Sequence, residues 1–468
     1  MARKRIILWL TGTEMRDGRA VVWVAVVMLV IAGLRKLLQP RQREAHRRGA
    51  LLGARTRRPH SPFGRRCAEA LTLAGVAIPL LDETKHFKFI GTTGTGKSTA
   101  IRELLRKAIG RGDRAVFADP DGGYCREFHQ RYRGDIVLNP FEADAVQWDL
   151  FGEIHSIYDA EQLASALIPD CEDASAREWR AYARTFLAAV IRRCYAAGMH
   201  NGQELWRLLT AASAEELRPW VAGTPAQPFM EVDNARMFGS IRAVLASAIA
   251  GFEFVQLQRA SAFSVRRWIR NTSECGNLFI PYKAGQIAAL RMMIAAWLRL
   301  AIFEALSQPE GRDQRLWFVV DELDALGAID GLKDALARLR KFGGRCVLGF
   351  QSVAQVASIY GPGAANTLLE NCGTTLILRC SASDNGGTSQ FASRLIGDRE
   401  VVRLQTSRGK DREGTLFGKG ARRSRNVTEQ QVIETAVMAS ELEQLPDLMG
   451  YLKTASSAEW LKVVLTRN

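Results

Sequence analysis

Eight residues in the first quarter of the chain restrict its fold more than any other feature. Gly91 to Ser98 read GTTGTGKS, which is the spacing G-x-x-x-x-G-K-S. An alternating apolar segment, HFKFI at 86–90, precedes them, and a helical pattern that includes Ile101 and Leu104 follows. This order predicts a phosphate-binding loop, because successive backbone N–H groups and the start of a helix then face one anion. The sequence therefore predicts an α/β nucleotide-binding domain.

The chemistry of the loop residues suggests individual roles. Glycines allow the tight backbone, Lys97 would reach the β- and γ-phosphates, and the Ser98 hydroxyl would be a ligand of Mg²⁺. ATP and Mg²⁺ are therefore the expected ligands. The alternative, a glycine-rich turn without a nucleotide, does not explain the flanking strand and helix. The expected nucleotide contacts are Gly91, Thr92, Thr93, Gly94, Thr95, Gly96, Lys97, Ser98 and Thr99.

A second motif, which is acidic, complements the loop. The uninterrupted apolar run LWFVV at 316–320 predicts a buried parallel strand, and Asp321 and Glu322 follow it directly. Asp321 would contact the metal, and Glu322 would polarise the water that attacks the phosphate. An ordinary strand that ends in a solvated acidic turn is the alternative interpretation. Together with the loop, the pair predicts a nucleotide-hydrolysing protein.

The long separation between the two motifs indicates an inserted domain. Strand patterns at 115–118 and 135–138 continue the α/β alternation, and residues 158–270 then show helical periods and no convincing strand. We expect a mostly parallel sheet that an all-α domain interrupts. The expected domains are a basic N-terminal segment (1–66), a first nucleotide-domain part (67–157), the all-α insert (158–270) and a second nucleotide-domain part (271–468). Further strands are expected at 277–282, 345–350 and 374–380.

The first 66 residues contain most of the net charge of +15, with 16 of the 64 Lys and Arg residues and 3 of the 49 Asp and Glu residues. The remaining 48 basic and 46 acidic residues make the body nearly neutral. An apolar segment near 20–38 would span about 28 Å as a helix, close to a hydrocarbon core. This segment predicts one transmembrane helix. Eleven basic residues in 35–66 against five in 1–19 predict that the body lies in the cytoplasm. A buried core helix is the alternative.

Besides HFKFIGTTGTGKST, the chain contains the longer stretches FADPDGGY, LNPFEADAVQWDLFGEI, EWRAYARTF, VVDELDALG, RKFGGRCVLGFQS and LMGYLKTA. This ordered set resembles the conjugative coupling proteins, the TraD/TrwB class of type IV secretion ATPases. The resemblance implies a RecA-like, membrane-anchored hexamer at the bacterial inner membrane with its motor in the cytoplasm. It would couple a relaxase–DNA complex to a secretion channel and pump single-stranded DNA.

The resemblance also implies two further site residues. Gln351, after the strand that follows the Asp321 strand, would sense the nucleotide. Arg340 would reach the ATP of the neighbouring subunit, with Leu332, Leu336 and Leu339 facing inward. A solvated arginine at a helix end is the alternative, and Arg338 and Arg345 are competitors for the role. The family usually has two membrane helices, whereas this sequence supports one.

Other functions and features stay open. An FtsK/HerA-type translocase and a docking receptor for secreted proteins, gated by ATP binding, are the competing functions. Residues 407–426 carry seven Lys and Arg against two acidic residues and would form a flexible tract that contacts DNA or is merely solvated. The eight cysteines contain no C-x-x-C pair, which favours reduced thiols over a zinc site.

Overall fold

The computed structural model describes residues 44–53, 70–171, 173–273, 276–310, 315–329, 331–383, 387–411 and 422–466. The chain forms two compact units. The larger unit combines Ala50–Asp398 with Thr435–Asn468, and the smaller combines Met1–Gly49 with Arg399–Glu434. The predicted transmembrane segment, 20–38, lies outside the described residues.

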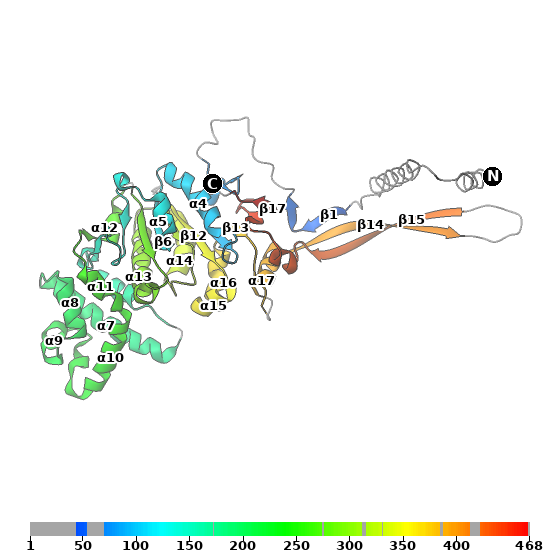
Figure 1. Ribbon diagram of the computed structural model, residues 1–468. Coiled ribbons are helices and arrows are strands. Elements are labelled where there is room, and N and C mark those ends of the chain that lie inside the picture. Colours follow the sequence, from blue (N-terminus) through cyan, green and yellow to red (C-terminus); the bar gives the residue numbers. More distant parts are fainter. Residues whose placement is uncertain are drawn as a thin grey trace, which may run out of the picture. The chain divides into compact units, whose positions relative to one another are not determined.

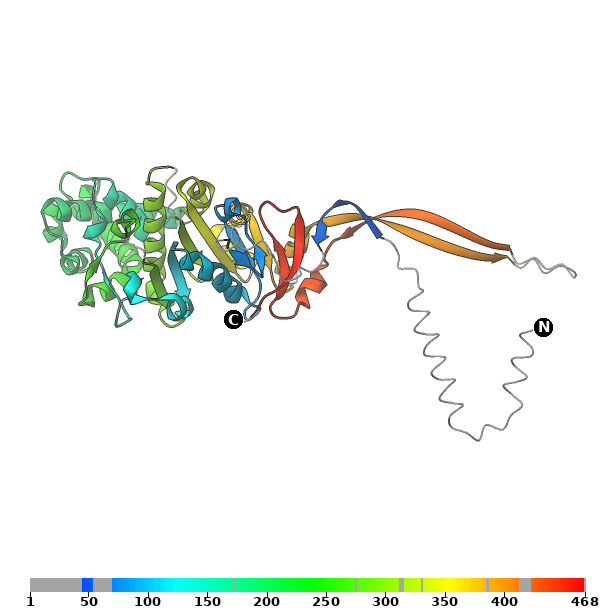
Figure 2. The same cartoon turned by 90° about the horizontal axis from the view of Figure 1, so that it is seen from above.

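A mostly parallel sheet organises the larger unit (Figures 1 and 2). In the described part of the unit, its ten strands have the order β2-β17-β16-β13-β5-β12-β11-β6-β10-β7. The seven strands from β13 to β7 are parallel, and β16 pairs with β13 in the antiparallel sense. The bounds are β2 Leu51–Gly53, β5 Phe87–Ile90, β6 Arg114–Pro120, β7 Ile136–Val137, β10 Leu278–Tyr282, β11 Leu316–Val320, β12 Gly344–Phe350, β13 Thr374–Ile377, β16 Met449–Lys453 and β17 Glu459–Val464.

The central strands are buried on both faces, which explains their continuous apolar sequences. In β11, Phe318 and Val320 belong to one hydrophobic cluster, and Trp317 and Val319 belong to the other. Helices α4 (Lys97–Gly110) and α5 (Gly123–Phe128) contribute to the second cluster, and α13 (Ile287–Leu306) and α14 (Leu332–Arg338) contribute to the first. The predicted α/β class with a mostly parallel sheet is confirmed.

The remaining elements of the larger unit connect these layers. The short hairpin β3–β4 precedes β5 in the chain, α15 and α16 lie between β12 and β13, and α17 and α18 follow β13. Their bounds are β3 Thr72–Leu73, β4 Val76–Ala77, α3 Leu80–Glu83, α15 Val353–Tyr360, α16 Pro362–Glu370, α17 Gly387–Ile396 and α18 Ala439–Glu443, with 3-10 turns η1 Arg131–Arg133, η2 Phe151–Glu153 and η5 Leu339–Phe342.

Helices dominate the inserted region, as predicted. They are α6 Asp159–Leu167, α7 Ala174–Ala196, α8 Gly202–Thr210, α9 Ala214–Val221, α10 Ala235–Ala248, α11 Ala250–Leu257 and α12 Val265–Arg270, with 3-10 turns η3 Gln227–Met230 and η4 Val232–Asn234. Side-chain caps begin several of them: Asp173 accepts from an N–H of α7, and Asn201 and Ser213 do the same for α8 and α9.

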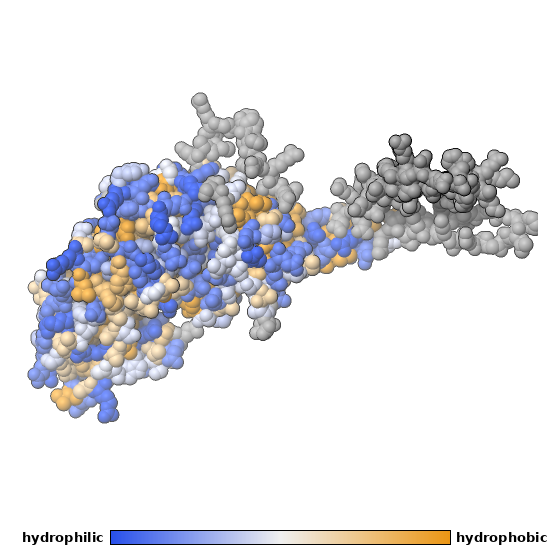
Figure 3. All heavy atoms as spheres, in the orientation of Figure 1, coloured by the Kyte–Doolittle hydropathy of each residue, from blue (hydrophilic) through white to orange (hydrophobic). Residues whose placement is uncertain are grey.

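One short strand in this region was not predicted. Ala262–Phe263 forms β9, which pairs in parallel with β8 (Gln147–Trp148). Two-residue strands carry no periodicity, so sequence alone gave no signal for this pairing. On the face shown in Figure 3, apolar residues of the helical region are interspersed with hydrophilic ones. Val232 and Leu257 are exposed apolar side chains of this region.

The smaller unit contains a three-stranded sheet in the order β1-β14-β15. Its strands are β1 Glu44–Gly49, β14 Asp398–Asp411 and β15 Arg422–Thr435. Both ends of the basic tract predicted to be flexible, 407–411 and 422–426, therefore belong to strands. The sequence there is polar and lacks clear alternation, which is why a strand was not expected.

The helices that the structure describes contain no single segment long and apolar enough to cross a membrane. One bent pair, Val232–Ala248 and Ala250–Leu257, reaches the required length and composition only when taken together, with a bend of 57°. Six cysteines lie among the described residues, and all six are free thiols: Cys125, Cys171, Cys194, Cys346, Cys372 and Cys380.

Candidate functional site

The predicted phosphate-binding loop connects the carboxyl end of β5 to the start of α4. Gly96 has a φ of 113°, a conformation that glycine adopts without strain. The Lys97 side chain is buried, and its ammonium donates to the carbonyl oxygens of Gly91 (2.6 Å) and Thr92 (3.2 Å). Burial lowers the pKa of Lys97, while nearby carboxylates act in the opposite direction. The loop therefore holds a buried cation next to the N-terminus of α4.

Strand register brings the acidic motif to this loop. Asp321 follows β11, and its Oδ2 accepts hydrogen bonds from the Ser98 hydroxyl (2.6 Å) and the Tyr124 hydroxyl (2.7 Å). The other oxygen, Oδ1, is buried and has no hydrogen-bond partner among the described residues. The neighbouring strand must approach closely, because a Cβ at Gly349 would lie 2.3 Å from the Asp321 carbonyl oxygen. One carboxylate oxygen is thus fixed, and the other is available to a ligand.

Glu322 is half-buried beside Asp321, and its carboxylate forms no hydrogen bond or ion pair with another described residue. Burial raises the pKa of Glu322, and the negative charges of Asp321 and Asp324 raise it further. Asp324 has a buried Oδ1 that also has no partner in the described part of the chain. A carboxylate with a raised pKa and a free oxygen is suited to accept a proton from water.

Three further hydrogen bonds hold the loop in place. The Thr93 hydroxyl donates to Oε1 of Gln351 (2.8 Å), which follows β12 directly. Thr92 N–H donates to the carbonyl oxygen of Arg379 (2.9 Å), after β13. The Thr95 hydroxyl donates back to Thr92 O (2.7 Å). Gln351 therefore contacts the loop, as its expected place after β12 requires. Of the remaining predicted contacts, Thr99 lies half-buried in the first turn of α4.

Arg340 lies apart from this cluster. It is exposed in the 3-10 turn η5, which follows directly after α14 ends at Arg338. Its side chain forms no hydrogen bond or ion pair within the described residues. Arg345 cannot compete for a role between subunits, because it is buried and donates to Glu83 (3.1 Å). Arg338 is exposed like Arg340. As predicted, Leu332, Leu336 and Leu339 are buried.

Two residues of the site were given no role from the sequence, although FADPDGGY contains both. Asp119, at the end of β6, accepts the backbone N–H groups of Tyr124 (3.0 Å) and Cys125 (2.7 Å) and so begins α5. Burial raises the pKa of Asp119 to about 6. The helix then places the Tyr124 hydroxyl on Asp321. A buried polar motif after a strand was the available signal, but its partner lies 197 residues away.

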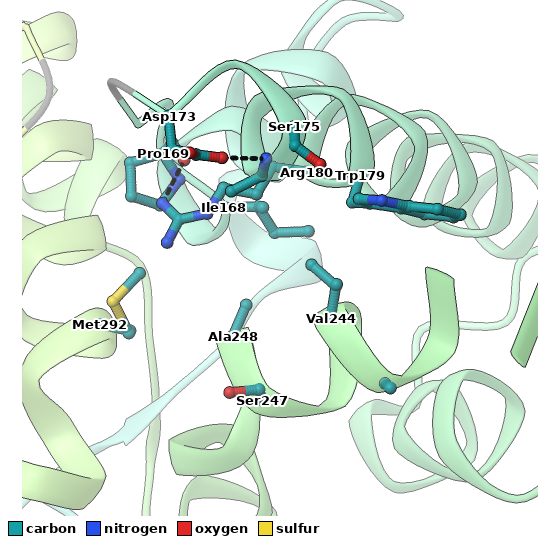
Figure 4. Close-up of a pocket in the computed structure, with 12 residues that line it drawn as sticks. Ile168, Pro169, Asp173, Ser175, Trp179, Arg180, Val244, Ser247, Ala248 and Met292 are labelled. Atoms are coloured by element: carbon teal, nitrogen blue, oxygen red, sulfur yellow. Dashed lines mark hydrogen bonds between the residues drawn. The ribbon is translucent and has the colours of Figure 1, made fainter. Parts of the chain in front are cut away.

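A separate hollow lies in the helical region (Figure 4). It has a volume of about 700 Å³, and residues from α7, α10 and α13 line it, among them Trp179, Val244 and Met292. Arg180 donates to the carbonyl oxygen of Pro169 (3.0 Å) at its edge. The described lining is mainly apolar, and that hydrogen bond occupies the arginine. This hollow therefore offers a packing surface rather than a reactive group.

The fold and the loop define a P-loop protein with an acidic edge beside the loop. A family model of the type IV secretion-system coupling protein DNA-binding domain matches residues 70–466. The chain belongs to the family of type IV secretion-system coupling proteins.

Individual relatives agree with this assignment. The chain is 32% identical over 388 residues to the coupling protein TraD of Escherichia coli strain K12, a match that covers 80% of this chain. It spans only 52% of the length of that relative. The structure of unbound TrwBdeltaN70, a bacterial conjugative coupling protein, is similar with a TM-score of 0.78 and 31% identity, covering 90% of this chain and 93% of that one. TrwB in complex with ADP and Mg²⁺ has a TM-score of 0.77 and 30% identity, covering 91% and 95%.

Proposed function

We propose that the protein is an ATP-hydrolysing motor that couples a relaxase–DNA complex to a type IV secretion channel and pumps single-stranded DNA during conjugation. The observation that carries this proposal is the convergence of Ser98, Asp321 and Glu322 at one edge of a coupling-protein fold. Ser98 and Asp321 are 2.6 Å apart, although 223 positions separate them in sequence. Such a pairing supports chemistry on a metal-bound nucleotide rather than packing alone.

The site fits Mg²⁺ and ATP. The buried Asp321 Oδ1 without a described partner and the Ser98 hydroxyl are oxygen ligands of the kind Mg²⁺ prefers. The backbone N–H groups of the loop and Lys97 would hold the phosphates. When bound, Mg²⁺ neutralises charge on the phosphate oxygens. The similarity to TrwB in complex with ADP and Mg²⁺ supports the same ligands here.

Within this site, Glu322 would orient and deprotonate the attacking water. Its raised pKa and its free oxygen suit that task. Gln351 would report the state of the nucleotide, because it already contacts Thr93 of the loop (2.8 Å). A change in the loop would then move β12 and the η5 turn that precedes it.

Arg340 would act on the nucleotide of the next subunit in a ring of six. Its exposure and its lack of a described partner support this role over a structural one. The test mixes two inactive proteins, Arg340→Ala and Lys97→Ala, and measures phosphate release while native mass spectrometry detects mixed rings. We expect partial recovery of activity, since one interface in a mixed ring pairs an intact loop with an intact arginine. Mixed rings without activity would contradict the role of Arg340, and Arg338→Ala is the matched control.

The remaining parts of the proposal concern location. The chain would be anchored in the bacterial inner membrane through the segment near 20–38, with the motor in the cytoplasm. There it would receive DNA with its relaxase and contact the secretion channel. Reporter fusions after residue 66 test the topology: a cytoplasmic reporter should be active, and activity of a periplasmic reporter would reverse the assignment.

A further inference from the structure

Charge is unevenly distributed along the β14–β15 hairpin of the smaller unit. The half near β1, residues 399–404 and 428–434, contains two arginines and three glutamates. The half beyond β1, residues 405–411 and 422–427, contains five basic residues and one acidic residue. The near half therefore has a net charge of −1 and the far half +4. The basic residues of the far half are Arg408, Lys410, Arg422, Arg423 and Arg425.

Ion pairs fasten the near half to β1. Arg47 donates to Glu400 (2.9 Å), and Arg48 also pairs with Glu400 from the same strand. Across the hairpin, Arg399 and Arg403 both pair with Glu434, at 2.8 and 2.7 Å. Within the smaller unit, these ion pairs hold the near half of the hairpin beside β1 (Figure 1).

The register of the sheet determines how far the hairpin extends. β1 and β14 are antiparallel, and Glu44, the first residue of β1, lies opposite Arg403. β14 continues for eight residues beyond that point, from Leu404 to Asp411. At about 3.3 Å per residue, this is roughly 26 Å past the start of β1. The hairpin therefore projects in the direction from which the chain enters β1.

The chain enters β1 from the segment near 20–38 that we proposed as the membrane anchor. Glu44 is six positions after Leu38. A chain of that length reaches at most about 22 Å, so the start of β1 lies within that distance of the end of the segment. This distance is shorter than the projection of the hairpin. We propose that the far half of the β14–β15 hairpin contacts the cytoplasmic face of the membrane and binds anionic lipid headgroups.

The charge pattern favours lipid over nucleic acid as the partner. The surface potential of an anionic leaflet attracts basic residues only within about a Debye length, roughly 10 Å. The net positive charge lies in the half that reaches the bilayer, and the half farther from it has a net charge of −1. A strand that tracked a DNA backbone would need positive charge along its length.

The test uses the full chain in nanodiscs, because the inference rests on the proposed membrane anchorage. A photoreactive amino acid replaces Ser407 in the far half or, as a matched control, Gln431 in the near half. Discs contain either phosphatidylcholine alone or phosphatidylcholine with phosphatidylglycerol. Mass spectrometry measures lipid attached after irradiation. We expect attachment at 407 in the anionic discs, about fivefold or more above that in the neutral discs, and little at 431.

A charge variant provides the second arm. The triple variant Arg408→Gln, Lys410→Gln, Arg425→Gln should lower attachment at 407 to the neutral-disc level. Its control removes three exposed arginines of the helical region, Arg218→Gln, Arg236→Gln and Arg259→Gln, and should leave attachment unchanged.

Each outcome supports or overturns the inference. Equal attachment in the two kinds of disc, or an effect of the control triple as large as that of the hairpin triple, would overturn it. Attachment of added single-stranded DNA at 407 in place of lipid would assign the hairpin to DNA instead. A chain that fails to enter the discs would remove the proposed anchor and this inference together, whereas an embedded chain without attachment would remove the inference alone.

Discussion

The amino and carboxyl edges of the parallel strands in the large sheet both hold buried charged side chains. The two edges differ in how many of these charges have a partner within the chain. At the amino edge, Arg111 donates two hydrogen bonds to Glu83 (2.9 and 2.6 Å) and pairs with Asp113 (2.7 Å). Arg345 donates to the same Glu83, and the Trp317 indole donates to Asp113 (2.8 Å). This edge is a closed network in which each charge has a partner from the chain itself.

At the carboxyl edge, the charges are only partly satisfied. Lys97 donates to loop carbonyl oxygens rather than to a carboxylate, and one oxygen each of Asp321 and Asp324 has no described partner. Because an unsatisfied buried polar group costs free energy, its persistence indicates a ligand. Burial of charge alone therefore does not distinguish the two edges; the unpartnered carboxylate oxygens of Asp321 and Asp324 do.

The largest effect is expected at the carboxyl edge. Lys97→Ala should abolish nucleotide binding and turnover, and Glu322→Gln should retain ATP binding while turnover falls about 10²–10⁴-fold, because the group that accepts the proton of the water is lost. Phosphate release and nucleotide binding are measured together with the midpoint of thermal unfolding, which should change little. The control is Lys107→Gln, an exposed lysine in the same helix. Wild-type turnover in Glu322→Gln would remove the role given to Glu322.

The amino edge should respond in stability instead of turnover. Glu83→Ala leaves Arg111 and Arg345 buried without their shared carboxylate, which should lower the free energy of unfolding by about 3–5 kcal/mol. Glu127 is partly exposed and pairs with Arg102 and Arg106. Its replacement by Ala should lower the free energy of unfolding by less than about 1 kcal/mol. Chemical denaturation measures both values. Equal losses at the two positions would contradict the distinction between closed network and surface pair.

A smaller effect is expected at the hydroxyl group that fixes Asp321. Tyr124→Phe keeps the stacked ring on Phe117 (5.5 Å) but removes the hydrogen bond to Asp321. A lost hydrogen bond of about 0.5–1.5 kcal/mol corresponds to a roughly two- to tenfold higher Mg²⁺ concentration at half-maximal turnover. A purely structural role would lower stability and leave the Mg²⁺ requirement unchanged. Tyr132→Phe, at an exposed tyrosine, is the control.

The same comparison shows what sequence could and could not predict. The loop, the Asp321 strand and the helical insert carry local patterns, so their elements were predicted within a few residues. The Gln351 contact with Thr93 also agrees with its expected place after a strand. The closed network at the amino edge was not predicted, because its charges come from segments up to 262 positions apart. Neither the Tyr124 hydrogen bond nor the strands of the basic hairpin has a local signature, since both depend on tertiary pairing.

The smallest expected effect concerns the pH dependence of turnover. Burial and the charges of Asp321 and Asp324 raise the pKa of Glu322, so this carboxyl group remains protonated at a higher pH than an ordinary glutamate. Only the deprotonated form can accept a proton from water, so turnover should fall with decreasing pH from a point above the usual glutamate range.

Asp324→Asn removes one of the charges that raise the pKa of Glu322. The acid limb of the rate profile should then move to lower pH by less than about one unit, with turnover at high pH largely retained. Asp334→Asn, at an exposed position of α14, should leave the limb in place. If the acid limb disappears in Glu322→Gln but does not move in Asp324→Asn, Glu322 titrates without sensing the charge of Asp324. If the acid limb persists in Glu322→Gln, the titration belongs to another group.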